Sequence, residues 1–208
     1  HAAEKVRQDP AASRTLPGLT EPGPFFMASA RFIPRKNLDG LLRAYAKYRQ
    51  RASTQKDTSS SWRLVLVGDG EERQALEHLV ASAGIPEVTF AGFRQIDELP
   101  AYYALAKVFI HPPHQEQWGL VVNEAMAAGL PVLVSKQCGA ASDLVVDGQT
   151  GFTFQSTDID HLADLLFKFS AGQVDAVGMG AASRQRIAQW GPARFADGMW
   201  SAVNAVFS

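Results

Sequence analysis

HPPHQEQWGLVVNEAMAAGLPVLVSK, residues 111–136, is the stretch that decides the fold. It follows an apolar run at residues 108–110, which predicts a buried strand. Gly119 then opens a run of good helix formers at residues 120–128, and the glycine and proline that follow are typical of a helix C-terminus. Residues 131–134 predict a second buried strand. Strand, loop, helix and strand in this order form a βαβ unit, which predicts a parallel sheet.

The start of the predicted helix is a candidate anion site. The first amides of a helix have no partner within the helix, and the helix dipole favours a negative charge there. Gly119 has no side chain, so a phosphate can approach its backbone closely. Glu116 precedes this point, and Glu124 lies inside the helix with its side chain leaning back toward the N-terminus.

Two carboxylates repel a phosphate, so Glu116 and Glu124 are better explained as acceptors of hydrogen bonds from hydroxyls. A phosphate with hydroxyls on both sides describes a nucleotide sugar, with ribose on one side and the transferred sugar on the other. Taken singly, each glutamate fits a solvated surface residue equally well. Their combination with Gly119 favours the binding site.

A second group of candidate residues follows the first predicted strand, residues 25–30. Arg31 and Lys36 flank a loop at the carboxyl end of this strand, which is where open α/β sheets bind ligands. Two permanent cations at this place suit a diphosphate. From charge alone, a solvated basic loop is the simpler explanation.

These motifs resemble a known family. Residues 116–127, EQWGLVVNEAMA, resemble the E-x7-E signature of retaining glycosyltransferases of family 4, which have the two-domain GT-B fold. That family usually reads P-S-x-x-E-x-F-G-L-x-x-x-E-A-M-A-x-G-x-P-V, and this chain has Pro113 for the serine and Trp118 for the phenylalanine. Arg31 and Lys36 match the family's R-x4-K pattern.

The resemblance implies how the diphosphate is held. Arg31 and Lys36 bind it and stabilise it as it leaves. The helix end at Gly119, Leu120 and Val121 provides backbone amides to the same group. Since these groups replace a metal ion, the resemblance implies no metal and no cofactor beyond the nucleotide-diphosphate sugar that serves as donor.

The resemblance also implies roles around the diphosphate. Glu124 binds the ribose hydroxyls, and Glu116 binds the transferred sugar and stabilises positive charge at its anomeric carbon. The candidate catalytic residues are therefore Glu116, Arg31 and Lys36. The backbone of Phe93, which follows a glycine at the end of a predicted strand, contacts the base.

The predicted organisation is one α/β domain with flanking segments. Residues 1–24 are expected to be a linker or a remnant of an inter-domain segment, and residues 25–191 a Rossmann-like nucleotide-sugar-binding domain with a mostly parallel sheet and helices on both faces. Residues 192–208 are expected to form a helix that packs back on an N-terminal domain. The resemblance spans about residues 25–205 and implies the C-terminal half of a GT-B enzyme. Because the chain begins with a histidine rather than Met, we expect it to be part of a longer protein.

The composition bears on partners and location. A net charge of −1 argues against a nucleic-acid-binding surface. The single cysteine, Cys138, permits no internal disulfide and favours a reducing compartment, so a cytoplasmic location is expected. No apolar run approaches the ~20 residues of a membrane span, which leaves only peripheral membrane contact through the acceptor half. Residues 158–160 read D-x-D, which binds metal and phosphate in the other large glycosyltransferase fold. Here these residues precede apolar residues at helical spacing, which favours a helix N-cap.

Three functions follow from these observations. The first is half of a hexosyltransferase that acts on a glycan, lipid or small-molecule acceptor, as in polysaccharide biosynthesis, and this half alone is expected to be inactive. The second is a sugar-nucleotide-binding module without catalysis. The third is a nucleotide-sugar epimerase of the GT-B type. The sequence leaves the base, the sugar and the acceptor open.

Overall fold

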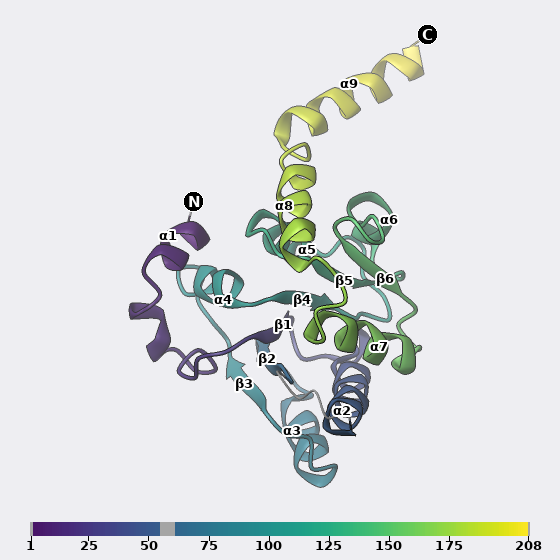
Figure 1. Ribbon diagram of the computed structural model, residues 1–208. Coiled ribbons are helices and arrows are strands. Elements are labelled where there is room, and N and C mark those ends of the chain that lie inside the picture. The colour runs from purple at the N-terminus through teal and green to yellow at the C-terminus, as the bar shows by residue number, and fades with distance from the viewer. Residues whose placement is uncertain (1, 55–60, 208) are drawn as a thin grey trace.

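The computed structural model describes residues 2–54 and 61–207, in which strands and helices alternate (Figure 1). The strands are β1 (Phe25–Ser29), β2 (Arg63–Val67), β3 (Val88–Gly92), β4 (Val108–His111), β5 (Val132–Ser135) and β6 (Gly151–Phe154). The α-helices are α1 (Ala2–Gln8), α2 (Leu38–Thr54), α3 (Arg73–Ser82), α4 (Leu99–Leu105), α5 (Leu120–Ala127), α6 (Gly139–Leu144), α7 (Ile159–Ser170), α8 (Ala176–Ile187) and α9 (Pro192–Phe207). Two short 3-10 helices are η1 (Ala12–Thr15) and η2 (Pro34–Lys36).

The six strands of the described residues form one sheet in the order β3-β2-β1-β4-β5-β6, and every neighbouring pair is parallel. The predicted Rossmann-like α/β fold is confirmed, and the sheet is wholly rather than mostly parallel. From β1 the chain continues to β2 and then β3 on one side of the sheet, whereas from β4 it continues to β5 and then β6 on the other side. The strand order therefore reverses between β1 and β4. Open α/β sheets bind ligands at this reversal, outside the carboxyl ends of the strands.

Helices cover both faces of the sheet because successive side chains of a strand point to opposite sides. In β1, Phe26 and Ala28 join a core with α2, α3 and α7, whereas Phe25 and Met27 join a second core with α4, α5 and α6. Figure 1 shows the first group of helices below the sheet and α4 and α5 above it. Two buried cores of this kind hold the strand ends rigidly.

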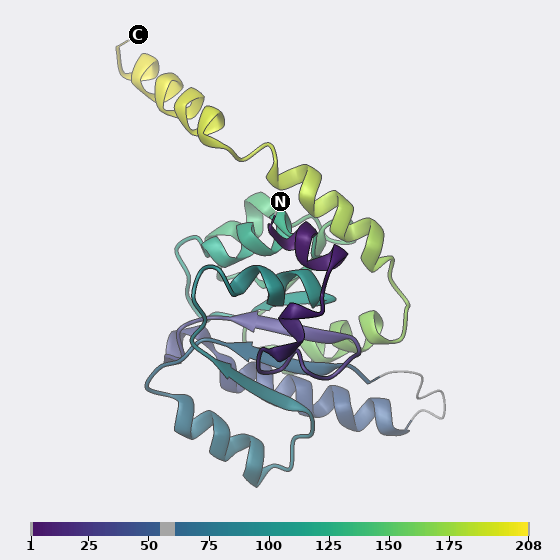
Figure 2. The ribbon, with the colours of Figure 1, turned by 90° about the vertical axis from the view of Figure 1, so that its left-hand side faces the viewer.

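The first 24 residues are attached to this domain through α1, which packs on α4 (Figures 1 and 2). Arg7 donates from Nε to the carbonyl of Ala104, 3.0 Å away, and from Nη2 to the carbonyl of Ala128, 2.5 Å away. Ala104 lies in the last turn of α4 and Ala128 is the C-cap of α5, where carbonyls lack partners within the helix. Leu19 is buried in the second core. The expectation that the segment links two domains stays a prediction, and His1 lies outside the described residues.

Replacing Arg7 with alanine is expected to lower the free energy of unfolding by about 1–2 kcal/mol, because the Ala104 carbonyl loses its charged donor and the Ala128 carbonyl keeps only the longer bond from Arg184. Urea unfolding of the 208-residue chain measures this. Arg14 is an exposed arginine of the same segment, so Arg14→Ala is the matched control and is expected to change stability by less than ~0.5 kcal/mol. Equal stabilities of the two variants would mean that α1 does not stabilise the domain.

The C-terminal helix α9 projects away from the domain (Figures 1 and 2). Met199 and Trp200 are 55% and 67% exposed. That this helix packs on another domain stays a prediction, and Ser208 lies outside the described residues. In the part of the chain that the structure describes, no helix is long and apolar enough to cross a membrane.

Candidate functional site

A cavity of about 400 Å³ opens at the reversal between β1 and β4. Its lining comes from the residues that follow β1, from η2, and from the loop and first turn of α5. The lining residues are Ser29, Ala30, Arg31, Ile33, Arg35, Lys36, Glu116, Gln117, Trp118, Gly119, Leu120 and Val121. The structure therefore brings together every predicted site residue except Glu124 and Phe93.

Two glycines hold the loop that carries Arg31. A Cβ on Gly68 would lie 1.9 Å from the carbonyl oxygen of Ala30, and a Cβ on Gly70 would lie 2.4 Å from that of Phe32. The Phe32 amide of this loop donates a hydrogen bond of 2.8 Å to the Asp69 carbonyl, in the turn that follows β2. The G-x-G pattern thus gives space for the arginine loop.

Asn37 joins the two halves of the cavity wall. It is 3% exposed and has a φ of 55°, in the left-handed region that asparagine tolerates. Its Nδ2 donates to the carbonyls of Pro112 and Ser156, both at 2.9 Å. Because Pro112 follows β4, these bonds hold Lys36 against the loop of Glu116. The sequence alone did not indicate this role, although the asparagine directly follows the lysine of the R-x4-K pattern.

Gly119 forms the start of α5 as predicted, with φ 91° and ψ 66°. A Cβ here would lie 2.9 Å from Sγ of Cys138 and 3.1 Å from Nε2 of His111. Helical hydrogen bonding begins with the amide of Val122, which donates to the Gly119 carbonyl at 2.9 Å. The preceding amides have no acceptor within the helix, and their residues line the cavity.

A largely buried ion pair joins Lys36 to Glu116, with side chains 14% and 12% exposed. Burial raises the pKa of Glu116, but the hydrogen bond and charge of Lys36 outweigh it and hold the pKa below its ordinary value. Glu116 is therefore an anion at neutral pH. Arg31, by contrast, is exposed and has no ion-pair partner among the residues at 2–54 and 61–207, so its guanidinium is available to a ligand.

His111 also reaches this cluster, a position that no motif in the sequence predicts. It ends β4 and is 1% exposed, and its Nε2 lies 3.6 Å from Oε2 of Glu116. Burial, and then the charge of Lys36, lower the pKa of His111 to about 4, so the imidazole is neutral at neutral pH. A histidine at the end of a strand gives no sequence signal of this contact.

Glu124 lies in a separate cavity of about 330 Å³, formed mainly by α1, α4 and α5. Its Oε2 accepts a hydrogen bond of 2.8 Å from the hydroxyl of Tyr103. Burial raises the pKa of Tyr103, so this hydroxyl stays protonated and donates. Ser29, which lines the cavity of Arg31, contacts the same hydroxyl. Tyr103 thus connects the two cavities, a role hidden in the sequence because an aromatic residue in a helix reads as core.

The family resemblance implies that Glu124 binds the ribose of a nucleoside diphosphate. On that interpretation, replacing Tyr103 with phenylalanine is expected to weaken nucleoside diphosphate binding about three- to tenfold, because the Glu124 carboxylate loses the ~1 kcal/mol bond that orients it. Calorimetry on the 208-residue chain measures the affinity. Tyr102→Phe is the control, since the Tyr102 hydroxyl donates instead to the Pro17 carbonyl at 2.9 Å. An affinity that falls equally in both variants would point to a loss of stability rather than of orientation.

Phe93 follows the last residue of β3 at the carboxyl edge of the sheet and is 67% exposed. It lines neither of the cavities that contain Arg31 and Glu124. Its predicted backbone contact with a base has no test in this geometry and stays a prediction.

The aspartates of the D-x-D sequence serve α7 and its neighbour. Asp158 is the N-cap of α7 and accepts from the His161 amide at 2.9 Å, as predicted. Asp160 forms an ion pair with Lys47 of α2, 2.5 Å away. Among the described residues, no group of three or more His, Cys, Asp or Glu side chains is arranged to hold a metal ion.

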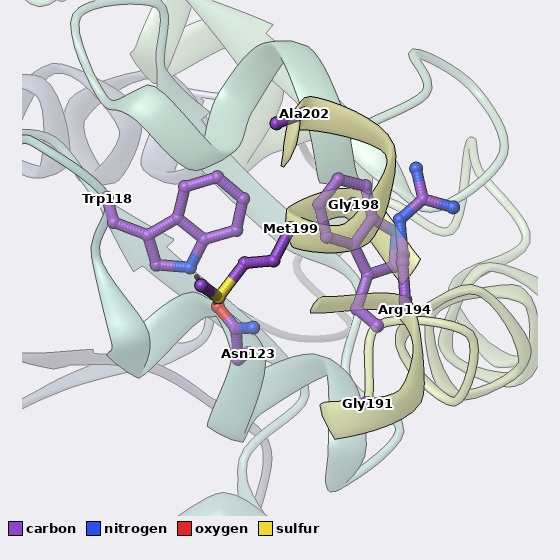
Figure 3. Close-up of a pocket in the computed structure, with 8 residues that line it drawn as sticks. Trp118, Asn123, Gly191, Arg194, Gly198, Met199 and Ala202 are labelled. Atoms are coloured by element: carbon purple, nitrogen blue, oxygen red, sulfur yellow. Dashed lines mark hydrogen bonds between the residues drawn. The ribbon is translucent and has the colours of Figure 1, made fainter. Parts of the chain in front are cut away.

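An apolar cavity of about 550 Å³ adjoins the loop of the site on the side of α9 (Figure 3). Trp118 donates from Nε1 to Oδ1 of Asn123 at 3.0 Å, and its ring lies 5.7 Å from that of Trp190. Since Trp118 directly precedes Gly119, these contacts fix the loop before α5. The tryptophan in place of the family's usual phenylalanine therefore has a structural role in this chain.

Comparison with known proteins gives a family match over most of the chain. The profile of the family described as Glycosyl transferases group 1 matches residues 13–186. A GDP-mannose-dependent alpha-(1-6)-phosphatidylinositol monomannoside mannosyltransferase of Mycobacterium tuberculosis is 35% identical over 198 residues, which cover 90% of this chain and 49% of that protein. The chain thus spans about half the length of the curated relatives it matches.

Solved structures agree with the fold. The sucrose-phosphate synthase of Thermosynechococcus elongatus superimposes with a TM-score of 0.75 and 28% identity, over 95% of this chain and 49% of that one. The C-terminal domain of a glycosyl transferase group 1 family protein from Francisella tularensis gives a TM-score of 0.65 and 20% identity, over 88% of this chain and 91% of that one. These neighbours are glycosyltransferases of the GT-B fold.

Proposed function

The chain belongs to the family of group 1 glycosyl transferases, and from this premise we propose that it is the C-terminal, donor-binding half of a retaining family 4 enzyme. The full-length enzyme transfers a hexosyl unit from a nucleotide-diphosphate sugar to an acceptor held by an N-terminal domain. The half-length coverage of the mannosyltransferases is consistent with such a second domain. The fold is also similar to that of a C-terminal domain solved separately, which supports a C-terminal place for this chain in the full-length enzyme.

The main support is the convergence of opposite charges at one end of the sheet. Arg31 and Lys36 come from the β1 side of the cavity, and Glu116 and the first amides of α5 come from the β4 side. Two cations and several free amides suit a diphosphate, while an anionic carboxylate beside them suits a sugar. No shared sequence segment forces this meeting, since Lys36 and Glu116 are 80 residues apart.

The leaving group is stabilised by these residues without a metal ion. As the bond between the sugar and the diphosphate breaks, negative charge grows on the diphosphate next to Arg31, Lys36 and the amides near Gly119. Preorganised donors of this kind contribute about 10²–10³-fold each to the rate of a reaction. The carboxylate of Glu116 stabilises positive charge on the anomeric carbon, and the proposal includes no covalent intermediate on it. Glu124 holds the ribose, oriented by Tyr103.

GDP-mannose is the first donor to test, because the mycobacterial relative is named as dependent on it. That relative also acts, by its name, on a phosphatidylinositol mannoside, which supports a lipid-linked acceptor and a peripheral contact with a membrane through the other domain. We place the reaction in the cytoplasm.

Calorimetry of the 208-residue chain with GDP, UDP and ADP tests the donor site directly. One of these nucleotides is expected to bind, and Arg31→Ala is expected to weaken it at least about tenfold, because a charged hydrogen bond of ~1.5–3 kcal/mol is lost. Arg43→Ala is the control, since Arg43 is paired with Asp39 on α2 outside the cavity. An unchanged affinity in Arg31→Ala would contradict the proposed diphosphate site.

Turnover by the full-length protein separates the three candidate functions. Release of GDP from GDP-mannose only when a lipid extract is added indicates a transferase. An isomerised donor without an acceptor indicates an epimerase. Binding without release under either condition indicates a non-catalytic module and would contradict the proposal.

A further inference from the structure

A buried nitrogen behind Glu116 and Gly119, two residues of the cavity lining, has no hydrogen-bond partner among the described residues. Nε2 of His111 makes no hydrogen bond to any described residue, although the side chain is 1% exposed. The imidazole lies directly beneath Gly119, since a Cβ there would be 3.1 Å from this nitrogen. It also stacks on Phe109, with ring centroids 6.5 Å apart and an interplanar angle of 16°. Packing from both sides therefore fixes the ring, and its unpaired nitrogen lies against Glu116 and Gly119.

Nε2 of His111 faces Oε2 of Glu116, the carboxylate oxygen to which Lys36 is already paired. Oε2 of Glu116 receives the ammonium of Lys36 and lies 3.6 Å from Nε2 of His111. The charged groups that act on the imidazole are Lys36 and Glu116, and Arg35 acts on Glu116 in turn. A carboxylate only accepts hydrogen bonds, so a neutral imidazole faces it favourably when the single ring proton is on Nε2.

Binding of a donor substrate changes which group pairs with the Glu116 carboxylate. The diphosphate competes for Lys36, because a diphosphate carries more negative charge than one carboxylate. Glu116 is 12% exposed, so without Lys36 it becomes a buried anion with few donors. Nε2 of His111, which has no hydrogen-bond partner among the described residues, lies 3.6 Å from Oε2 of Glu116.

We propose that His111, with its proton on Nε2, is a positioning residue for Glu116 and takes over this carboxylate when the diphosphate draws Lys36 away. The exchange keeps Glu116 ionised and aimed at the sugar during transfer. The step in which the diphosphate draws Lys36 rests on the proposed function, whereas the contact between His111 and Glu116 does not.

A ligand-free experiment tests the contact. Lys36→Met removes the ammonium permanently, and NMR of the 13C-labelled side-chain carboxyl reports the pKa of Glu116 in the 208-residue chain. Adding His111→Leu to Lys36→Met is expected to raise that pKa by about one unit, a tenfold change in the protonation equilibrium, because the hydrogen-bond donor is lost. Adding His111→Gln instead is expected to restore at least half of the difference, since an amide nitrogen can donate from the same place. The same pKa in all three variants would overturn the proposal.

A second measurement needs no variant at this position. The 15N–1H correlations of the imidazole in the unmodified chain and in Lys36→Met are expected to show the proton on Nε2. A proton on Nδ1 in Lys36→Met would overturn the proposal even where His111→Leu does not fold.

Nucleotide binding then tests the exchange. As a single change, His111→Leu is expected to weaken GDP binding about tenfold. Added to Glu116→Gln, it is expected to have no effect on GDP binding, because the glutamine carries no charge that could be left unpaired. A purely structural role of His111 would weaken binding equally in both backgrounds. A chain that binds no nucleoside diphosphate contradicts the proposed donor site and the exchange, while the NMR measurements still decide whether His111 holds Glu116.

Discussion

Replacing Gly119 with alanine is expected to weaken nucleoside diphosphate binding about 100-fold and to lower the free energy of unfolding by about 2–4 kcal/mol. The φ of 91° costs a residue with a Cβ about 1–3 kcal/mol. The new Cβ would also lie 2.9 Å from the buried sulfur of Cys138 and 3.1 Å from His111, and overpacking of this kind costs about 1–3 kcal/mol. The start of α5 must move away, so two amide bonds to the diphosphate, about 1.5 kcal/mol each, are lost.

Gly148→Ala separates these causes. Gly148 has a similar φ of 78°, but a Cβ there meets no atom within 4 Å. The control is therefore expected to lose about 1–2 kcal/mol of stability through strain alone and to leave the affinity unchanged. Urea unfolding and calorimetry with the nucleotide that binds unmodified protein measure both quantities. If Gly119→Ala kept the affinity of the unmodified chain, the helix end would not be the diphosphate site.

The βαβ unit around α5 was predictable because its signals are local. Apolar runs, a glycine at each end of the helix and a proline before β5 follow one another in 25 residues or so, and each acts on the backbone next to it. The parallel sheet followed from this alternation of strands and helices. The order of the strands did not, because it depends on which buried faces pack together rather than on any single segment.

The same distinction separates the predicted site residues from the missed ones. Arg31, Lys36 and Glu116 were predictable because each belongs to a short motif, but their meeting in one cavity depends on β1 lying beside β4. The roles of Asn37, His111 and Tyr103 depend on how the fold packs. Asn37 and Tyr103 form hydrogen bonds to residues 75 and 21 positions away, and Nε2 of His111 lies 3.6 Å from the Glu116 carboxylate without a hydrogen bond, so tertiary packing sets each of these contacts.

Even a local motif can have a purpose that only the fold reveals. The Gly68-Asp69-Gly70 turn reads as a weak phosphate signal, yet both glycines lie against the backbone of the Arg31 loop. The glycines thus position a cation instead of binding an anion themselves. A charge that is held in place by backbone packing needs less reorganisation when the diphosphate arrives, which is the condition for strong electrostatic stabilisation.

Replacing Glu116 with glutamine is expected to change turnover and binding in opposite directions. Transfer by the full-length protein is expected to fall about 10²–10³-fold, because the stabilisation of positive charge at the anomeric carbon is lost. The affinity of the 208-residue chain for nucleoside diphosphate is expected to rise about three- to tenfold. Lys36 is then no longer held by a carboxylate, and the diphosphate no longer meets a negative charge.

The opposite signs make this variant informative. A damaged fold would weaken both transfer and binding, whereas a donor site built as proposed loses one and gains the other. Glu71→Gln is the control, because Glu71 is exposed and lies outside the lining of the cavity. Release of nucleoside diphosphate with an acceptor present measures transfer, and calorimetry measures binding. A variant that transfers at the unmodified rate would remove Glu116 from the reaction, and one that binds nucleotide more weakly would mean that the ion pair with Lys36 does not compete with the diphosphate.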